Sequence, residues 1–259
     1  RAGEKIFIDY CGPTVPVVDR STGEVRKAQV FVAVLGASSY TFAEATWSQS
    51  LPDWVASHQR MLNFFGGVPE LLVPDNLKAA VTKADRYSPT INETYAELAC
   101  HYQTAVLPAR PYKPKDKAKA ETSVLLVERW ILARLRHQTF FSLAELNTAI
   151  AALLPALNQR PFQGRVESRQ SLYDALDRPA LRPLPATPYT YAEWRKARPG
   201  IDYHIEIDKR LYSVPHALVG LVLDVRLTDT ALEVMHKGQR VALHPRHGKS
   251  RFVTLTEHM

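Results

Sequence analysis

The almost wholly apolar run at residues 29–35 constrains the fold of this chain more than any other stretch. A strand with one exposed face would alternate polar and apolar residues, so this run predicts a strand that is covered on both faces. Strand-like segments at 5–10 and 40–46 lie on either side of it, and Gly23 in the turn at 19–23 suits the positive φ of a hairpin. We therefore expect three antiparallel strands at the start of the chain.

Helix and strand patterns then alternate as far as residue 157. A helix that connects two strands builds parallel pairing, so the sheet should be mixed. The predicted elements follow in the order helix, strand, helix, strand, helix, helix: 50–65, 70–74, 92–102, 103–107, 117–137 and 142–157. The predicted fold class is therefore α/β, with a five-stranded mixed sheet and flanking helices.

The composition changes after residue 158. Five prolines interrupt residues 159–188, which predicts an extended linker with one short helix at 171–176. The hydrophobic period then becomes two in several short segments, which is typical of a small all-β barrel. We expect three parts: a core at 1–158, a linker at 159–188 and the barrel at 189–259.

The positive charge is placed unevenly. Residues 1–100 contain 9 Lys and Arg against 11 Asp and Glu, whereas residues 101–259 contain 24 against 15. The excess begins in one tight loop at 110–119, which favours a polyanionic partner such as nucleic acid over an ordinary solvated surface.

No apolar run approaches the roughly 20 residues of a membrane-spanning helix. Two cysteines without paired spacing indicate neither disulfides nor a zinc site, so we expect a reducing cytoplasm.

Three carboxylates fall at places where they could meet. Asp9 lies near the end of the first strand, Asp75 follows the strand at 70–74, and Glu121 lies in the first turn of the long helix, about 80° from its buried stripe. Each has a structural alternative, as a turn residue, a cap or a charge favoured by the helix dipole. Three converging carboxylates would repel one another without a cation, so together they predict a divalent metal site. Glu128 is the reserve third carboxylate.

These residues resemble the DDE motif of transposases and retroviral-type integrases. The likeness is to the IstA-type transposases, in which a lysine run like that at 113–119 precedes the glutamate, and it continues into residues 129–136. The resemblance covers the whole chain and implies an RNase H-like catalytic core followed by a small β-barrel. It implies that Asp9, Asp75 and Glu121 are the catalytic residues and the ligands of Mg²⁺, for which Mn²⁺ can substitute.

The resemblance also implies a function. Such an enzyme cleaves the DNA 3′ ends of an insertion sequence and joins them to target DNA by transesterification. The implied partners are transposon-end and target DNA, further copies of the chain on DNA, and an AAA+ ATPase helper, in a bacterial cytoplasm. The family carries helix-turn-helix segments upstream, so we expect a fragment that lacks them. The candidate phosphate contacts are cations around the carboxylates: Lys78, Arg110, Lys113, Lys115, Lys117 and Lys119.

Two other functions remain open from the sequence. One is a metal-dependent nuclease that uses the same carboxylates without strand transfer. The other is a non-catalytic DNA-binding or assembly protein that keeps the fold and the basic surface. The histidines His58 and His101 are expected to be structural. Five histidines of the expected barrel should lie on its surface: His204, His216, His236, His244 and His247.

Overall fold

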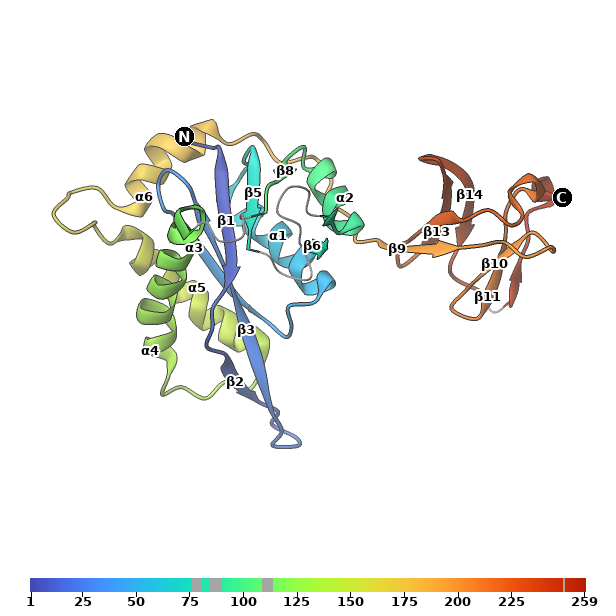
Figure 1. Ribbon diagram of the computed structural model, residues 1–259. Coiled ribbons are helices and arrows are strands. Elements are labelled where there is room, and N and C mark those ends of the chain that lie inside the picture. Colours follow the sequence, from blue (N-terminus) through green and yellow to red (C-terminus); the bar gives the residue numbers. More distant parts are fainter. Residues whose placement is uncertain (76–80, 84–89, 109–113, 249) are drawn as a thin grey trace. The chain divides into compact units, whose positions relative to one another are not determined.

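The computed structural model describes residues 1–75, 81–83, 90–108, 114–248 and 250–259. The chain divides into two compact units, Arg1–Tyr189 and Thr190–Met259 (Figure 1). Each unit is described separately below. Residues 159–188, which we expected to form a separate linker, belong to the first unit.

The first unit is built on a six-stranded mixed sheet. β1 pairs antiparallel with β3 and parallel with β5, and β5 pairs parallel with β8. The strand order is β2-β3-β1-β5-β8, and β4 lies off this path and also pairs with β3, along residues 29–34. The strands are β1 Lys5–Tyr10, β2 Val15–Val18, β3 Val25–Leu35, β4 Thr41–Thr46, β5 Leu71–Pro74 and β8 Ala105–Val106. The predicted mixed sheet is confirmed, with the short strand β2 as an addition.

The helices of the first unit lie where the sequence pattern predicts them, with small differences at their ends. The expected long helix begins at Pro114 and contains a π-helical turn, η1, before its last turn. The segments are α1 Leu51–Phe65, α2 Glu93–His101, α3 Pro114–Val127, η1 Glu128–Leu132, α4 Ala133–Leu135, α5 Leu143–Gln159 and α6 Arg169–Leu172. α6 continues into η2 Tyr173–Asp177 and η3 Arg178–Ala180. Two further strands, β6 Val81–Lys83 and β7 Thr90–Ile91, pair antiparallel with each other.

Helices cover both faces of the sheet. On one face, Trp54 and His58 of α1 pack against the ring of Phe31, each with its ring centroid 5.6 Å from that of Phe31. On the other face, Val127 of α3 and Ile131 of η1 are fully buried in one cluster with side chains of β3 and β4. The second half of β3 is therefore buried on both sides, as the apolar run at 29–35 predicts.

Two asparagines of α5 close the free edge of β4. The side chain of Asn158 accepts a hydrogen bond from the Thr41 amide at 2.9 Å and donates one to the Thr41 carbonyl at 2.8 Å. Asn147 does the same for Ala45, at 2.6 and 2.9 Å. An edge strand presents unpaired backbone groups to any other chain, so these amides satisfy groups that a neighbouring strand would otherwise bind.

Residues 169–182 are anchored to the first unit by buried polar contacts. The carboxylate of Asp177, which is wholly buried, accepts hydrogen bonds from the amides of Gly3 and Ser38, both at 2.8 Å. The hydroxyl of Tyr173 donates to the Phe65 carbonyl at 2.7 Å. Buried side-chain acceptors of this kind fix a segment in place, which explains why this part of the expected linker belongs to the first unit.

The second unit is all-β and consists of two small sheets. One contains β10 His204–Ile207, β11 Arg210–Ser213 and β15 Phe252–Val253, and the other has the order β14-β13-β12-β9. The strands of the second sheet are β9 Glu193–Ala197, β12 Leu223–Leu227, β13 Ala231–His236 and β14 Gln239–Pro245. The expectation that its histidines lie on the surface is wrong for His204 and His244, which are buried and hydrogen-bonded to Thr254 Oγ1 and the Ser213 carbonyl respectively.

Candidate catalytic site

Asp9 and Asp75 lie on neighbouring strands. In the parallel pair of β1 and β5, Ile8 lies opposite Pro74, and the amide of Asp75 donates to the Ile8 carbonyl at 3.1 Å. One step further along this register, Asp75 lies opposite Asp9. The two positions are 66 residues apart in sequence and adjacent in the sheet.

Both aspartates are on the face of the sheet that α3 and η1 cover. Side chains alternate between the faces of a strand, and residues that lie opposite each other in register share a face. Asp9 lies opposite Val32, which packs in the cluster that contains Val127 and Ile131. The same helix run that carries Glu121 therefore covers the face to which both aspartates belong.

The surroundings of Asp9 are partly buried and negatively charged. One oxygen of its carboxylate accepts a hydrogen bond from the Tyr10 amide at 2.8 Å. Two residues along, burial raises the pKa of the Cys11 thiol to about 12, and the negative charges of Glu128 and Asp9 add to the shift. Glu128 therefore lies close enough to Cys11 to act on it, from the first residue of η1.

Glu121 differs from the two aspartates in its surroundings. It lies in α3 and is exposed. Among the described residues, no group of three or more carboxylate, histidine or cysteine side chains is arranged to hold a metal ion. The meeting of Glu121 with Asp9 and Asp75 therefore stays a prediction, and the half-buried Glu128 is the other acidic residue on the same helix run.

The cations that the sequence associates with the site lie largely outside the described residues. Lys78, Arg110 and Lys113 fall in segments that the structure does not describe. The backbone of Lys115, Lys117 and Lys119 forms the first turns of α3, so the lysine run does open the helix that carries Glu121. Their contacts with phosphate stay predictions.

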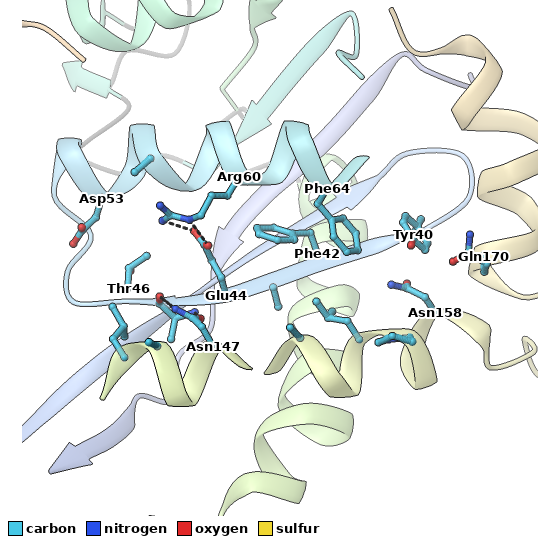
Figure 2. Close-up of a pocket in the computed structure, with 18 of the residues that line it drawn as sticks. Tyr40, Phe42, Glu44, Thr46, Asp53, Arg60, Phe64, Asn147, Asn158 and Gln170 are labelled. Atoms are coloured by element: carbon cyan, nitrogen blue, oxygen red, sulfur yellow. Dashed lines mark hydrogen bonds and ion pairs between the residues drawn. The ribbon is translucent and has the colours of Figure 1, made fainter. Parts of the chain in front are cut away.

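One cavity lies away from the aspartates. It has a volume of about 770 Å³ and is bounded by β4, α1 and α5 (Figure 2). Figure 2 shows the carboxylate of Glu44 paired with the guanidinium of Arg60, at 2.6 and 2.8 Å. Neither Asp9 nor Asp75 is among its lining residues, so this cavity belongs to the sheet edge and not to the candidate catalytic site.

A second cavity, near η1 and α6, was missed by the sequence analysis. It is lined by arginines from three separate segments, Arg129, Arg160 and Arg169. No spacing in the sequence relates these residues. The only local signal is that Arg129 and Arg160 each lie within two positions of an aromatic residue, and Arg169 has no such neighbour.

In the helices of the part of the chain that the structure describes, no stretch is long and apolar enough to cross a membrane.

Comparison with known proteins agrees with this architecture. The integrase core domain model matches residues 1–114, and the model of the Mu transposase C-terminal domain matches residues 184–255. A simian T-cell lymphotropic virus intasome structure, in complex with a PP2A regulatory subunit, contains a chain that matches with a TM-score of 0.51 and 14% identity, over 94% of this chain and 76% of that one. The fold is thus that of an integrase catalytic core followed by an all-β region.

Two curated relatives are transposases. The chain is 54% identical to a putative transposase of Sinorhizobium fredii over 100% of its own length and 50% of that protein. It is 28% identical to the transposase of insertion sequence element IS21 of Pseudomonas aeruginosa, over 86% of this chain and 57% of that protein. The chain is thus similar to transposases of insertion sequences, and it combines an integrase core domain with a Mu transposase C-terminal domain. It spans about half the length of the curated relatives it matches.

Proposed function

We propose that this chain is the catalytic part of a DDE transposase, which cleaves the 3′ ends of an insertion sequence and transfers them to target DNA. One observation carries the proposal. The register of β1 and β5 places Asp9 opposite Asp75, on the face covered by the helix run that begins with the lysine run and carries Glu121. Two carboxylates so placed beside a basic helix start suit chemistry on a phosphodiester.

The donor atoms at this place fit a divalent metal. Carboxylate oxygens are the ligands that Mg²⁺ and Mn²⁺ prefer, and two adjacent carboxylates are repelled unless a cation lies between them. Asp9 and Asp75 would hold the metal, with Glu121 as the third ligand. A bound divalent metal supplies the positive charge that stabilises the negatively charged phosphorus centre and activates the attacking hydroxyl.

The protein residues supply position and charge. Asp9 is held by the sheet on both sides, and its carboxylate is oriented by the hydrogen bond from the Tyr10 amide at 2.8 Å. The lysines at the start of α3 would hold backbone phosphates of the DNA beside the carboxylates, because each cation that neutralises a phosphate also releases counterions. A rigid sheet and a basic helix start together orient the scissile bond.

A strand-transfer assay tests the proposal. The chain, and a protein of the full length of its relatives, are incubated with labelled transposon ends, target DNA and Mg²⁺. We expect joined product from the unaltered protein. Asp9→Asn and Asp75→Asn should each reduce joining by about 100-fold or more, because several kcal/mol of charge stabilisation is lost. The matched control Asp229→Asn removes an exposed carboxylate in the second unit and should leave joining unchanged.

The same assay separates the alternatives. Nicked DNA without joined product would support a metal-dependent nuclease. DNA binding without cleavage in either Mg²⁺ or Mn²⁺ would support an assembly protein. The further partners implied by the family, namely other copies of the chain on DNA and an AAA+ ATPase helper, are proposals on the same basis. The mass of the DNA-bound complex tests the first, and stimulation of joining by an added ATPase with ATP tests the second.

A further inference from the structure

A second cavity in the first unit carries positive charge that the proposed reaction does not use. It has a volume of about 440 Å³ and is formed by the α3–η1 run, the end of α5, the loop that follows and the start of α6. Three arginines line it, Arg129, Arg160 and Arg169, together with the aromatic rings of Trp130 and Phe162. The described residues that line this cavity include no Asp or Glu.

Arg169 is the most constrained of the three arginines. It lines the cavity, is only 8% exposed, and its Nε has no hydrogen-bond partner among the described residues. Burial lowers the pKa of the Arg169 guanidinium, and the positive charge of Arg160 lowers it further. A buried N–H without a hydrogen-bond partner is unfavourable, so an acceptor that reaches Arg169 Nε would be bound favourably.

Aromatic rings hold two of the guanidinium groups in place. The Cζ of Arg160 lies 3.7 Å from the ring centroid of Trp130, and the Cζ of Arg169 lies 4.7 Å from that of Phe162. A ring attracts the flat face of a guanidinium and makes no use of its N–H groups. Within the described part of the chain, Arg129, Arg160 and Arg169 form no ion pair with Asp or Glu. Their N–H donors are therefore available to an anion.

Three arginines that line one cavity favour a phosphate. Arg129 and Arg160 are exposed and Arg169 is buried, and the charge of Arg160 acts on Arg169. Like charges that line one cavity repel, and an anion between them offsets that repulsion. Each guanidinium presents a planar fork of donors that matches the oxygens of a carboxylate or a phosphate. A phosphate offers more acceptor oxygens than a carboxylate does, so it can be bound by several arginines at once.

The place of the cavity on the helix run indicates which phosphate it would bind. Arg129 follows Glu121 by eight residues, which is about 12 Å along a helix axis, or the rise of three to four nucleotides of duplex DNA. In the same turns Val127 and Ile131 face the sheet and are fully buried, whereas Arg129 and Trp130 line the cavity. The cavity therefore lies on a different side of the helix from the face that holds Asp9 and Asp75.

We propose that Arg129, Arg160 and Arg169 form a binding site for a backbone phosphate of a DNA segment other than the one cut at the aspartates. This inference rests on the proposed function for the identity of the polyanion as DNA. A second DNA segment is what a reaction that joins two DNA molecules has to hold. The cavity would fix that segment at a set distance from the carboxylates.

The test measures DNA binding by the full chain. The fluorescence anisotropy of a labelled duplex reports binding, and EDTA is present so that no cleavage occurs. Arg160→Gln and Arg129→Gln should each weaken binding by about tenfold and lower the salt slope of log K by about one, as expected for a lost phosphate contact. The control Arg136→Gln removes an exposed arginine that follows α4 and does not line the cavity, and it should change binding by less than about twofold.

Arg169→Met separates a binding role from a structural one. Because Arg169 is buried without an ion pair to Asp or Glu among the described residues, it should be replaceable by Met with an equal or higher melting temperature in phosphate-free buffer. Inorganic phosphate should raise the melting temperature of the unaltered chain and not that of Arg169→Met. A melting temperature that falls by several degrees in Arg169→Met would show that Arg169 supports the fold, and it would overturn the proposal.

The remaining outcomes are equally decisive. Unchanged DNA affinity and salt slope in the Arg160 and Arg129 variants would refute a DNA phosphate, even if inorganic phosphate or poly-glutamate binds the unaltered chain. An equal loss in Arg136→Gln would mean diffuse attraction and no built site. If Arg129→Gln and Arg160→Gln weaken DNA binding while the unaltered protein joins no strands, the phosphate site stands and the proposed transfer reaction fails. If strands are joined and these two variants bind DNA normally, only the phosphate site fails.

Discussion

Replacing Asn158 tests how the edge of the central sheet is held. This residue is 1% exposed and makes two hydrogen bonds to the backbone of Thr41, which is itself fully buried. Asn147 makes the equivalent pair of bonds to Ala45 but is only half-buried. The two side chains thus make the same interaction at different depths, which provides a matched comparison within one helix.

The magnitude follows from what each substitution leaves behind. Asn158→Ala leaves one buried N–H and one buried C=O without partners, each of which costs about 1–3 kcal/mol. Both asparagines line the 770 Å³ cavity beside β4, so water can enter and reduce that cost. We therefore expect Asn158→Ala to lower the free energy of unfolding by about 2–4 kcal/mol, and Asn147→Ala to lower it by about 1–2 kcal/mol.

Urea unfolding followed by circular dichroism measures both changes, with the transition of each unit fitted separately. Asn158→Asp adds a sharper test. An ionised carboxylate accepts from the Thr41 amide but cannot donate to its carbonyl, whereas a protonated one can do both. Burial raises the pKa of such a carboxyl, so the cost of Asn158→Asp should grow as the pH rises. A loss below about 1 kcal/mol in Asn158→Ala, or a larger loss in Asn147→Ala, would refute the reasoning.

Three other predictions concern the site and the fold. Glu121→Gln should abolish strand transfer, whereas Glu128→Gln should retain it. The opposite result would identify Glu128 as the third ligand, since its charge raises the pKa of the Cys11 thiol, two residues from Asp9. Burial lowers the pKa of His58 from 6.5 to about 4. The free energy of unfolding should therefore fall by about 3 kcal/mol as the pH falls through that range. The variant His58→Gln should flatten this pH dependence in urea titrations. Gly67→Ala should cost about 1–3 kcal/mol in the same assay, because its Cβ would lie 2.7 Å from that of Leu181; an unchanged stability would mean that the segment shifts freely.

Much of the fold could be predicted from periodicity. The strands around the run at 29–35 and the helix that ends at Gly66 follow directly from the pattern of apolar residues, and Gly66 does adopt the left-handed conformation at φ +62°. β2 was missed because its four residues include Pro16 and show no clear alternation. The π-helical turn η1 was also missed, because a π turn needs one extra residue per turn and leaves no mark in composition.

The candidate site was predictable only in part. Asp9 and Asp75 could be expected to meet, because strand order and parallel pairing follow from the alternation of helices and strands. The arginines of the second cavity could not, since Arg129, Arg160 and Arg169 come from three elements that only packing brings together. The buried histidine His244 was likewise out of reach, because its burial depends on how two small sheets close over it.

The sequence by itself determined the order and type of the main elements, the places of the two aspartates at strand ends, and the lysine run before Glu121. These features are local, since they depend on periods of two and 3.6 residues and on residues close together in the chain. The tertiary structure decided which face each carboxylate belongs to, that residues 159–188 belong to the first unit, and that three arginines share one cavity. Those outcomes depend on contacts between segments far apart in sequence, and no local pattern encodes them.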